Sequence, residues 1–340
     1  MNGKKSFRAS AAIAGIITLA AASGCSSANS SGGDVLNVGQ ISDSVAFFPL
    51  YVAEEQGFFD EEGVTLGERP RLGTGAKLAA ALTSGSIDVG AGVITDAFNL
   101  AENNSDAMIT GSLVTEYYVD VIAGDGFEGP GSDAPLEDRI RALEGKKIGI
   151  TGPGSGTEAL LIYLFNQVGL DAKKDATLVN LGAVSSSAIG AMSSGQVDAL
   201  AFFQPAGQMA EAEGVGEIYI SPQRGDVPNM TGSLHGVLFS TGDLIEAKGE
   251  QVDAFNAGID RALEFIADNP DESAELLTSY LEGTDPAAVK ALEQILPQEM
   301  AASTAVERSA FDTAVEFHNE SGLIGDRPDY SEVVWDSVRD

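Results

Sequence analysis

Cysteine, histidine and basic residues are scarce in this chain of 340 residues. The single cysteine, Cys25, has no partner for an intrachain disulfide and cannot form a thiolate cluster for zinc or iron–sulfur binding. The two histidines, His235 and His318, are too few for a metal site built from imidazoles. We therefore expect no metal site and no cofactor.

Positive charge is also rare, with 19 Lys and Arg against 51 Asp and Glu and a formal net charge of −32. Such a chain repels phosphate backbones and anionic lipid headgroups, which excludes nucleic acid as an expected partner. Hydrophobic residues make up 44% and charged residues 21%, a composition that excludes disorder. Because single cores rarely grow beyond about 250 to 300 residues, the length predicts two domains.

Residues 1–24 follow the plan of a secretory signal peptide, with Lys4, Lys5 and Arg8 before an apolar run from Ala9 to Ala22. That run is too short to span a bilayer comfortably. One interpretation is a plain signal peptide with an incidental cysteine. We favour the other, a lipobox-like site at which Cys25 is acylated, although Ala22 stands where such sites usually have Leu. Residues 25–34 would then be the lipidated cysteine and a flexible Ser/Gly tether.

From residue 35 onward, apolar strands alternate with helical patterns, as in α/β proteins with a mainly parallel sheet. The first series predicts strands over Val35–Ile41, Thr65–Glu68 and Ile87–Val93, with helices over Phe48–Gln56 and Ala76–Thr83. After the loop Gly124–Pro135, the second predicts strands over Lys146–Thr151, Ala176–Leu181 and Val197–Phe203, with helices over Thr157–Val168 and Ser187–Ser193. The match between Ala81–Asp88 and Ala191–Asp198 supports two similar lobes, although glycine-capped αβ turns are common.

Beyond Gly249 the pattern is helical, with helices predicted over Gln251–Ala267 and Thr304–His318. We expect this tail to pack on the lobes and Trp335 to be a packing anchor. His318 is expected on a surface-like helix, and His235 in a structural role.

Four segments are candidate binding loops because each follows a predicted strand or opens a helix. In open α/β sheets, ligands bind outside the carboxyl ends of the strands. The clearest is Gly152–Thr157, whose glycines and free amides suit an anionic or carbonyl oxygen. It lacks the lysine of a Walker A loop and the third glycine of a dinucleotide fingerprint, and a capped turn without a ligand is the alternative. The others are Ser42–Ser44, Arg71–Gly75 and Val93–Thr95; Asp43 could equally cap a helix, and Arg71 could simply be solvated.

The segment Phe48–Val64 (FPLYVAEEQGFFDEEGV) resembles the opening of solute-binding proteins of ABC importers for sulfonates, taurine, nitrate and thiamine-precursor pyrimidines. The likeness continues through Ala81–Asp88, Leu143–Gly149, Gly154–Thr157, Ser194–Ala199 and Gln204-Pro205, and spans most of residues 35–268. It implies a type II periplasmic-binding-protein fold, with two α/β lobes, a hinge and a helical C-terminal tail. Lobe 1 would comprise 35–121 and 237–340, and lobe 2 would comprise 122–236.

The resemblance also implies that loops from both lobes contact one small molecule. The matching positions here are Ser42, Asp43, Ser44, Gly73, Thr74, Gly75, Thr95, Gly154, Ser155, Gly156, Thr157 and Gln204. Relatives often carry an acid at the position of Gln204, so the charge of the ligand stays open. Phe47, Phe48, Tyr117 and Tyr118 are candidates to stack on a ring, with core packing the stronger alternative for the two Phe.

The function implied is an extracytoplasmic, lipid-anchored and monomeric solute-binding protein that delivers its solute to an ABC permease. A sulfonate-like anion and a nitrogen heterocycle both remain candidates, although the acidic body would slow the encounter with anions. Two other classes stay open. An enzyme resembling an aminopyrimidine-forming synthase would need reactive side chains, and the chain has no Gly-x-Ser-x-Gly or His-Glu-x-x-His motif. A surface scaffold would not need two facing amide-rich loops.

Overall fold

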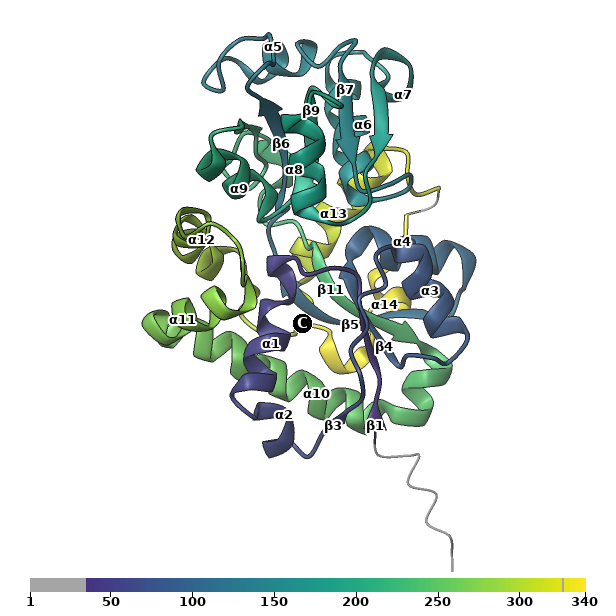
Figure 1. Cartoon of the computed structure of the whole chain (residues 1–340). Helices are drawn as coiled ribbons and strands as arrows, with labels where there is room; N and C mark the ends of the chain where they lie inside the picture. Colours follow the sequence, from purple (N-terminus) through teal and green to yellow (C-terminus); the bar gives the residue numbers. More distant parts are fainter. Residues whose placement is uncertain (1–34, 326) are drawn as a thin grey trace, which may run out of the picture. The chain divides into compact units, whose positions relative to one another are not determined.

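The computed structural model describes residues 35–325 and 327–340. The predicted signal peptide, the acylation of Cys25 and the tether lie outside these residues. The described body is an α/β structure with two mixed sheets, each flanked by helices, as Figure 1 shows. We call the sheet formed by strands within residues 38–114 and 236–241, with its helices, lobe 1, and the sheet formed by strands within residues 119–220, with its helices, lobe 2.

In lobe 1 the strands are β1 (Val35–Leu36), β2 (Val38–Gln40), β3 (Thr65–Leu66), β4 (Val89–Val93), β5 (Ala107–Val114) and β11 (Gly236–Thr241). The four-stranded sheet has the order β2-β4-β11-β5, and β1, which leads directly into β2, pairs with β3 in parallel. Strand β2 is parallel to β4, whereas β11 is antiparallel to both of its neighbours. The antiparallel strand is therefore the one that enters from lobe 2.

Lobe 2 repeats this plan with β6 (Val119–Gly124), β7 (Lys147–Ile150), β8 (Thr177–Asn180), β9 (Ala199–Phe203) and β10 (Gly216–Ile220) in the order β10-β6-β9-β7-β8. Here β6, which enters from lobe 1, is antiparallel to β9 and β10. We number the strands of each lobe in chain order, count β1 and β2 as one strand, and set apart the strand that enters from the other lobe. In both lobes the order across the sheet is then second, first, third, incoming and fourth strand. The two lobes thus share one topology, as the repeated pattern in the sequence predicts.

The crossing from lobe 1 to lobe 2 lies earlier than the predicted position near Val121. Strand β5 ends in lobe 1 at Val114, and β6 already pairs with β9 from Val119, so the chain crosses within residues 115–118. The strand on which the chain re-enters lobe 1, β11, begins at Gly236.

The matched helix-to-strand turns occupy equivalent places in the two lobes. Gly85 and Gly195 both adopt left-handed backbone conformations, with φ of 68° and 72°. In lobe 1, Asp88 accepts a hydrogen bond from the amide of Asn37 at 2.7 Å, and in lobe 2 Asp198 accepts one from the amide of Lys147 at the same distance. Each aspartate thus ties the start of the third strand to the first strand of its sheet.

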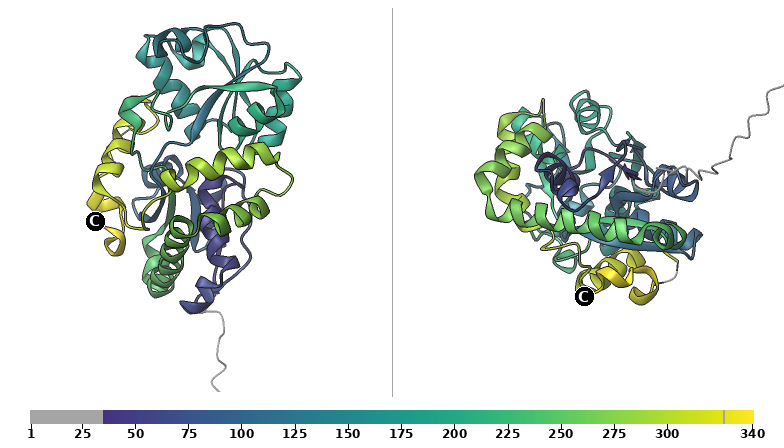
Figure 2. Two further views of the ribbon diagram at one scale, coloured as in Figure 1. Left: turned by 90° about the vertical axis from the view of Figure 1, so that its left-hand side faces the viewer. Right: turned by 90° about the horizontal axis from the view of Figure 1, so that it is seen from below.

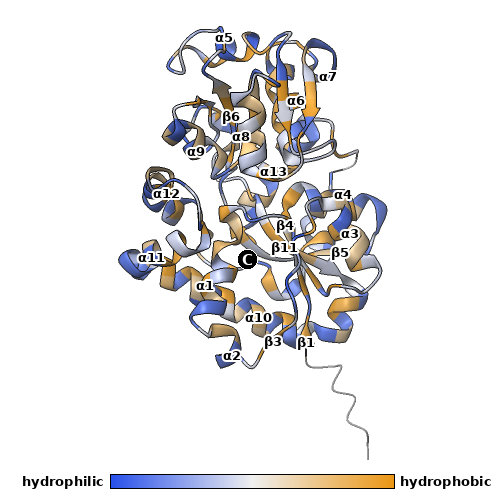
Figure 3. Ribbon diagram, viewed as in Figure 1, coloured by the Kyte–Doolittle hydropathy of each residue, from blue (hydrophilic) through white to orange (hydrophobic). Residues whose placement is uncertain are grey.

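Helices cover both faces of each sheet because successive strand residues point to opposite sides. In β11, Leu238 packs against the cluster of α1 (Phe48–Glu55) and α10 (Gly242–Asp268), whereas Val237 and Phe239 pack on the opposite face. The helices of the two βα series are α1 (Phe48–Glu55), α2 (Phe58–Glu61), α3 (Gly75–Thr83), α4 (Ile94–Asn103), α5 (Leu136–Arg141), α6 (Gly156–Gln167), α7 (Ala172–Asp175), α8 (Ser185–Ser193) and α9 (Ala206–Glu213), with the short turns η1 (Val45–Phe47) and η2 (Pro228–Met230). Figure 3 shows apolar strands between helices that carry hydrophilic residues.

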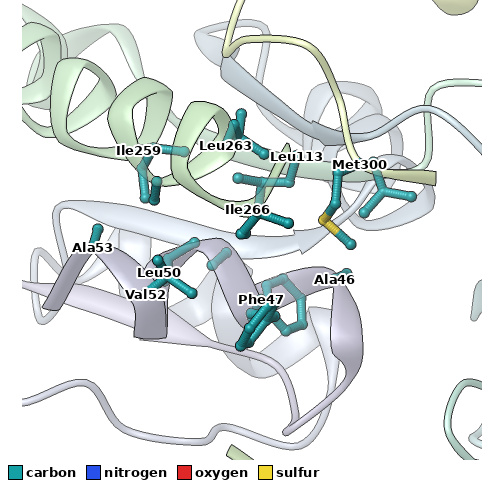
Figure 4. Close-up of a cluster of buried hydrophobic side chains, with 14 of the residues drawn as sticks. Ala46, Phe47, Leu50, Val52, Ala53, Leu113, Ile259, Leu263, Ile266 and Met300 are labelled. Atoms are coloured by element: carbon teal, nitrogen blue, oxygen red, sulfur yellow. The ribbon is translucent and has the colours of Figure 1, made fainter. Parts of the chain in front are cut away.

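The largest apolar cluster of lobe 1 joins the N-terminal helices to the C-terminal part of the chain. Figure 4 shows Leu50 and Val52 of α1 facing Ile259, Leu263 and Ile266 of α10 (Gly242–Asp268). Helix α10 begins earlier than predicted and has one non-helical residue, Lys248. The segment that carries the family-like sequence motif is thus fixed by the helical tail.

The rest of the tail comprises α11 (Pro270–Tyr280), α12 (Pro286–Glu299), α13 (Arg308–Glu320), α14 (Tyr330–Val333) and η3 (Asp336–Val338). Helix α13 belongs to both lobes, because Phe311 packs in a lobe 1 cluster and Phe317 in the main cluster of lobe 2. In Figure 2 this yellow helix runs beside both sheets. Trp335 packs against apolar clusters of lobe 1, in keeping with a packing anchor. Within the described residues, no helix is both long and apolar enough to cross a membrane.

Candidate functional site

A cavity of about 1050 Å³ lies between the two lobes. It is reached by the carboxyl ends of β2, β4, β7, β8 and β9, where ligands of open α/β sheets bind. Its lining includes apolar side chains such as Ile41 and Phe203 and four asparagines, Asn99, Asn103, Asn104 and Asn180. Among the lining residues, all within the described part of the chain, none is a lysine or an arginine.

Lobe 1 contributes the N-terminal ends of two helices. Thr74 caps α3 by accepting a hydrogen bond from the amide of Lys77 at 3.3 Å, and Gly75 opens that helix at the cavity. Helix α4 follows β4 without a loop and lines the cavity with Asp96 and Asn99. Asn99 also donates a hydrogen bond to the carbonyl oxygen of Gly154 in lobe 2 at 3.0 Å. The two lobes are therefore in direct contact at the edge of the cavity.

Lobe 2 contributes the loop Gly152–Thr157, in which the sequence predicts free amide donors. Ser155 caps α6 through its hydroxyl, and the amides of Thr151, Gly154 and Ser155 all have partners within residues 152–158. The partner of the Gly154 amide is the carboxylate of Glu158, at 2.8 Å. Much of the donor capacity of this loop is thus used by the protein itself.

The structure brings most of the predicted binding residues to the cavity. The predicted residues in its lining are Ser42, Gly73, Thr74, Gly75, Tyr118, Gly154, Ser155, Gly156 and Thr157. They come from both lobes, as the two facing loops in the sequence predict.

Four predicted residues of lobe 1 lie away from the lining. Asp43 forms an ion pair with Arg71 at 2.6 Å and does not cap a helix, so Arg71 is not merely solvated. The capping residue is Ser44, which accepts a hydrogen bond from the amide of Ala46. Phe47 is fully buried in the core of lobe 1, in keeping with core packing, and Thr95 is turned toward the C-terminal tail.

Gln204 is also outside the lining, because it is fully buried beside α12. Its amide donates to Glu299 Oε1 at 3.1 Å and so joins the loop before α9 to the tail. Asp120 on β6 is a second buried acid, and burial raises the pKa values of both Asp120 and Glu299 to about 7. Gln204 thus has a structural partner in the tail and does not face the cavity.

The two segments that cross between the lobes meet in a buried aromatic group. The ring of His235 lies 3.9 Å from that of Tyr117 and 4.7 Å from that of Tyr118, measured between centroids. Tyr118 and His235 line the cavity, whereas Tyr117 donates its hydroxyl to the carbonyl oxygen of Gly156 at 2.6 Å. Burial lowers the pKa of His235 well below its usual value, so its ring is neutral. His235 therefore has two roles: it lines the cavity, and it packs against Tyr117 and Tyr118 where the chain crosses between the lobes.

The expectation that His318 lies on a surface-like helix is wrong. Its side chain is fully buried, and its Nε2 lies 2.7 Å from Thr95 Oγ1. The helix packs against both lobes, so the face that carries His318 is covered.

Asp96 is the functional candidate that the sequence analysis missed. It is the third residue of α4, only 6% exposed, and lines the cavity. Burial raises its pKa to about 7, opposed by a hydrogen bond from the amide of Val93. An acid at the third position of a helix that directly follows a buried strand was the available signal. No group of three or more His, Cys, Asp or Glu within the described residues is arranged to hold a metal ion.

The paired topology and the cavity between the lobes define a periplasmic-binding-protein fold, and comparisons with known proteins agree. The chain belongs to the NMT1-like family, whose model matches residues 35–279. A curated relative, the putative binding protein YtlA of Bacillus subtilis, is 27% identical over 199 residues, which are 58% of this chain and 57% of that protein. The match thus spans little more than half of the length of that relative.

Two solved structures cover nearly the whole fold. The alkanesulfonate-binding protein SsuA of Xanthomonas axonopodis, bound to MOPS, has a TM-score of 0.70 at 20% identity, over 90% of this chain and 99% of that one. The periplasmic aliphatic sulphonate-binding protein SsuA of Escherichia coli has a TM-score of 0.68 at 20% identity, over 90% and 98%. These likenesses establish the fold.

Proposed function

We propose that this protein is the extracytoplasmic solute-binding component of an ABC importer. The observation that carries the proposal is the cavity of about 1050 Å³ between the carboxyl ends of two sheets with the same topology. Family membership and the sulfonate-binding proteins of similar fold support it. On this proposal the protein binds and delivers a small organic solute and is not an enzyme.

The solute would bind between the lobes and select a closed arrangement that the permease recognises. Residues 115–118 and the segment between β10 and β11 would carry the hinge. The nine predicted residues that line the cavity, of which Ser42 is the first and Thr157 the last in the sequence, would contact the solute. The solute itself would be sulfonate-like, as for the two sulfonate-binding proteins of similar fold, or taurine-like, or a pyrimidine-like thiamine precursor.

We further propose that Cys25 is acylated and anchors a monomeric protein to the outer face of the cytoplasmic membrane. The sequence around Cys25 and the Ser/Gly-rich residues 26–33 support this. Cys25→Ser should move the protein from the membrane fraction to the soluble fraction without changing solute binding. Retention of this variant in the membrane fraction would exclude the anchor.

The function is tested by thermal-shift screening of the purified protein against sulfonates, taurine, nitrate and aminopyrimidines. A bound solute raises the unfolding midpoint according to its concentration relative to Kd. Hits are then titrated calorimetrically, and small-angle scattering measures whether the protein becomes more compact. A hit that is bound but causes no compaction would contradict the closing mechanism, whereas the absence of any hit across wider panels would contradict solute capture.

A further inference from the structure

Asp96 places a carboxylate at the cavity with one oxygen unpaired. Its Oδ2 accepts a hydrogen bond from the amide of Val93 at 3.1 Å. Its Oδ1 has no hydrogen-bond partner among the described residues. Because the side chain is more than nine-tenths buried and lines the cavity, this oxygen is available to a bound solute.

Two glycines make room for this carboxylate. A Cβ atom at Gly75 would lie 1.8 Å from Asp96 Oδ1, and one at Gly92 would lie 2.9 Å from Oδ2. Neither glycine has a left-handed backbone, so backbone conformation does not explain them. The space they leave is occupied by the carboxylate, which is thus held between the start of α3 and the end of β4.

Among the residues that the structure describes, the cavity lining has no positively charged side chain to balance the negative charge of an ionised Asp96. Its lining, within the described residues, has no lysine or arginine, and the imidazole of His235 is neutral. The nearby polar side chains, including Asn99 and Asn103, are uncharged. A buried carboxylate without a cation is costly unless donors from a ligand compensate it.

Two of the three helix N-termini at the cavity, those of α4 and α6, already carry acids of the protein, and the third, that of α3, lies against the Asp96 carboxylate at Gly75. Helix N-termini attract anions, but α4 and α6 each carry an acid at the third helical position, Asp96 and Glu158. Glu158 accepts the amide of Gly154 and also pairs with Lys173 at 3.4 Å. A sulfonate at either helix end would lie beside a carboxylate.

We propose that Asp96 is the residue that selects solute charge, so that the cavity takes a solute presenting an N–H donor at this point and rejects one presenting an oxyanion there. The donor group would be an ammonium, an amidinium or the amino group of a heterocycle. This inference rests on the proposed function and narrows its solute class. It separates the protein from the sulfonate-binding proteins whose fold it shares.

Matched probes test the selection. Benzamidine, a cation near neutral pH, and benzenesulfonate, an anion, share one ring, and 4-aminopyrimidine is a neutral nitrogen donor. We expect the wild-type protein at pH 8 to bind benzamidine or 4-aminopyrimidine more tightly than benzenesulfonate by calorimetry. Because hydrogen bonds to charged groups are the strong ones, Asp96→Asn should weaken binding of the nitrogen probes about 10- to 100-fold.

Asp138→Asn is the control, since it neutralises an acid at the same helical position of α5, where the side chain is exposed and lies outside the cavity lining. It should leave the affinity ratio of benzamidine to benzenesulfonate unchanged. Thermal unfolding of both variants verifies folding, and Asp96→Ser provides a second removal of the charge.

Three results would overturn the proposal. They are tighter binding of benzenesulfonate than of the nitrogen probes, an unchanged ratio in Asp96→Asn and Asp96→Ser, and no binding of any nitrogen probe. If a sulfonate binds and small-angle scattering shows compaction, solute capture stands and only charge selection fails. If solutes of neither class bind, the proposed function fails as well.

Discussion

Thr95 Oγ1 and His318 Nε2 lie 2.7 Å apart and connect the start of α4 to the C-terminal tail. The His318 Nδ1 lies 2.7 Å from the carbonyl oxygen of Ala314, which can only accept, so Nδ1 carries the proton. Burial lowers the pKa of His318 to about 4, and in the resulting neutral ring Nε2 accepts the Thr95 hydroxyl. The tail thereby supports the helix that carries Asp96.

His318→Ala should therefore destabilise the protein by about 2 to 4 kcal/mol, because it removes a buried hydrogen bond and leaves a cavity. Urea denaturation at pH 7.5 measures this. Glu316→Ala on the exposed face of the same helix is the control and should change stability by no more than about 0.5 kcal/mol. A His318→Ala variant as stable as that control would show that the contact does not support the fold.

The close approach of Gly75 to Asp96 predicts energetic coupling. Gly75→Ala should cost about 1 to 3 kcal/mol, since the new methyl group must displace the carboxylate. In an Asp96→Ala background the same substitution should cost at least 1 kcal/mol less, roughly the coupling expected of residues in contact. Four urea denaturation curves complete the double-mutant cycle. Additive effects would mean that Asp96 does not occupy the space above Gly75.

The general fold was predictable from the sequence, because hydrophobic periodicity and glycine caps are local signals. Asp88 and Asp198 even occupy equivalent positions in the two lobes. The crossing at 115–118 was not predictable, because β5 and β6 lie on either side of it without any change in composition. Periodicity finds strands but does not say which sheet each one joins.

The candidate site was predictable as a set of loops but not as a set of contacts. Gly73–Gly75 and Gly154–Thr157 line the cavity because strand ends of both lobes face it. His318 is buried against Thr95, which is 223 positions away in the sequence. The space that the Asp96 carboxylate occupies depends on two glycines in other elements, Gly75 and Gly92. Such long-range relations leave no periodic signal in the sequence.

Replacing the buried acid of β6, Asp120, should raise the stability of the protein by an amount that depends on pH. Asp120 Oδ1 accepts from Gln223 at 3.3 Å, Oδ2 has no partner among the described residues, and burial raises the pKa to about 7. The folded state therefore keeps this proton between about pH 4 and pH 7 while the unfolded state loses it, so the contribution of Asp120 to stability falls as pH rises. Asp120→Asn removes that loss.

We expect Asp120→Asn to be more stable than wild type by about 2 to 4 kcal/mol at pH 8, with a much smaller difference at pH 4.5. Denaturation curves at the two pH values measure this, with Asp133→Asn in an exposed loop as the control. An equal difference at both pH values would show that Asp120 does not titrate as its burial implies.

Solute binding should depend on the ionisation of Asp96. Tyr117 and Tyr118 lie near Asp96, and His235 lines the same cavity. All three stay neutral between pH 5 and pH 8.5, because burial raises the pKa values of the tyrosines and lowers that of the histidine. Burial raises the pKa of Asp96 itself to about 7. Below that value a proton competes with a cationic solute for the carboxylate.

The affinity for benzamidine, which is cationic throughout this range, should therefore be constant above about pH 8 and fall by up to about tenfold per pH unit below 7. Calorimetric titrations at pH 5.5, 6.5, 7.5 and 8.5 measure the profile, and bound benzamidine should move its midpoint below 7 because it stabilises the ionised form. Asp96→Asn should bind weakly and with a flat profile. A wild-type profile that is equally flat, or that rises toward acid pH, would mean that the cation is held by another group, and the charge of the solute would then be set elsewhere in the cavity.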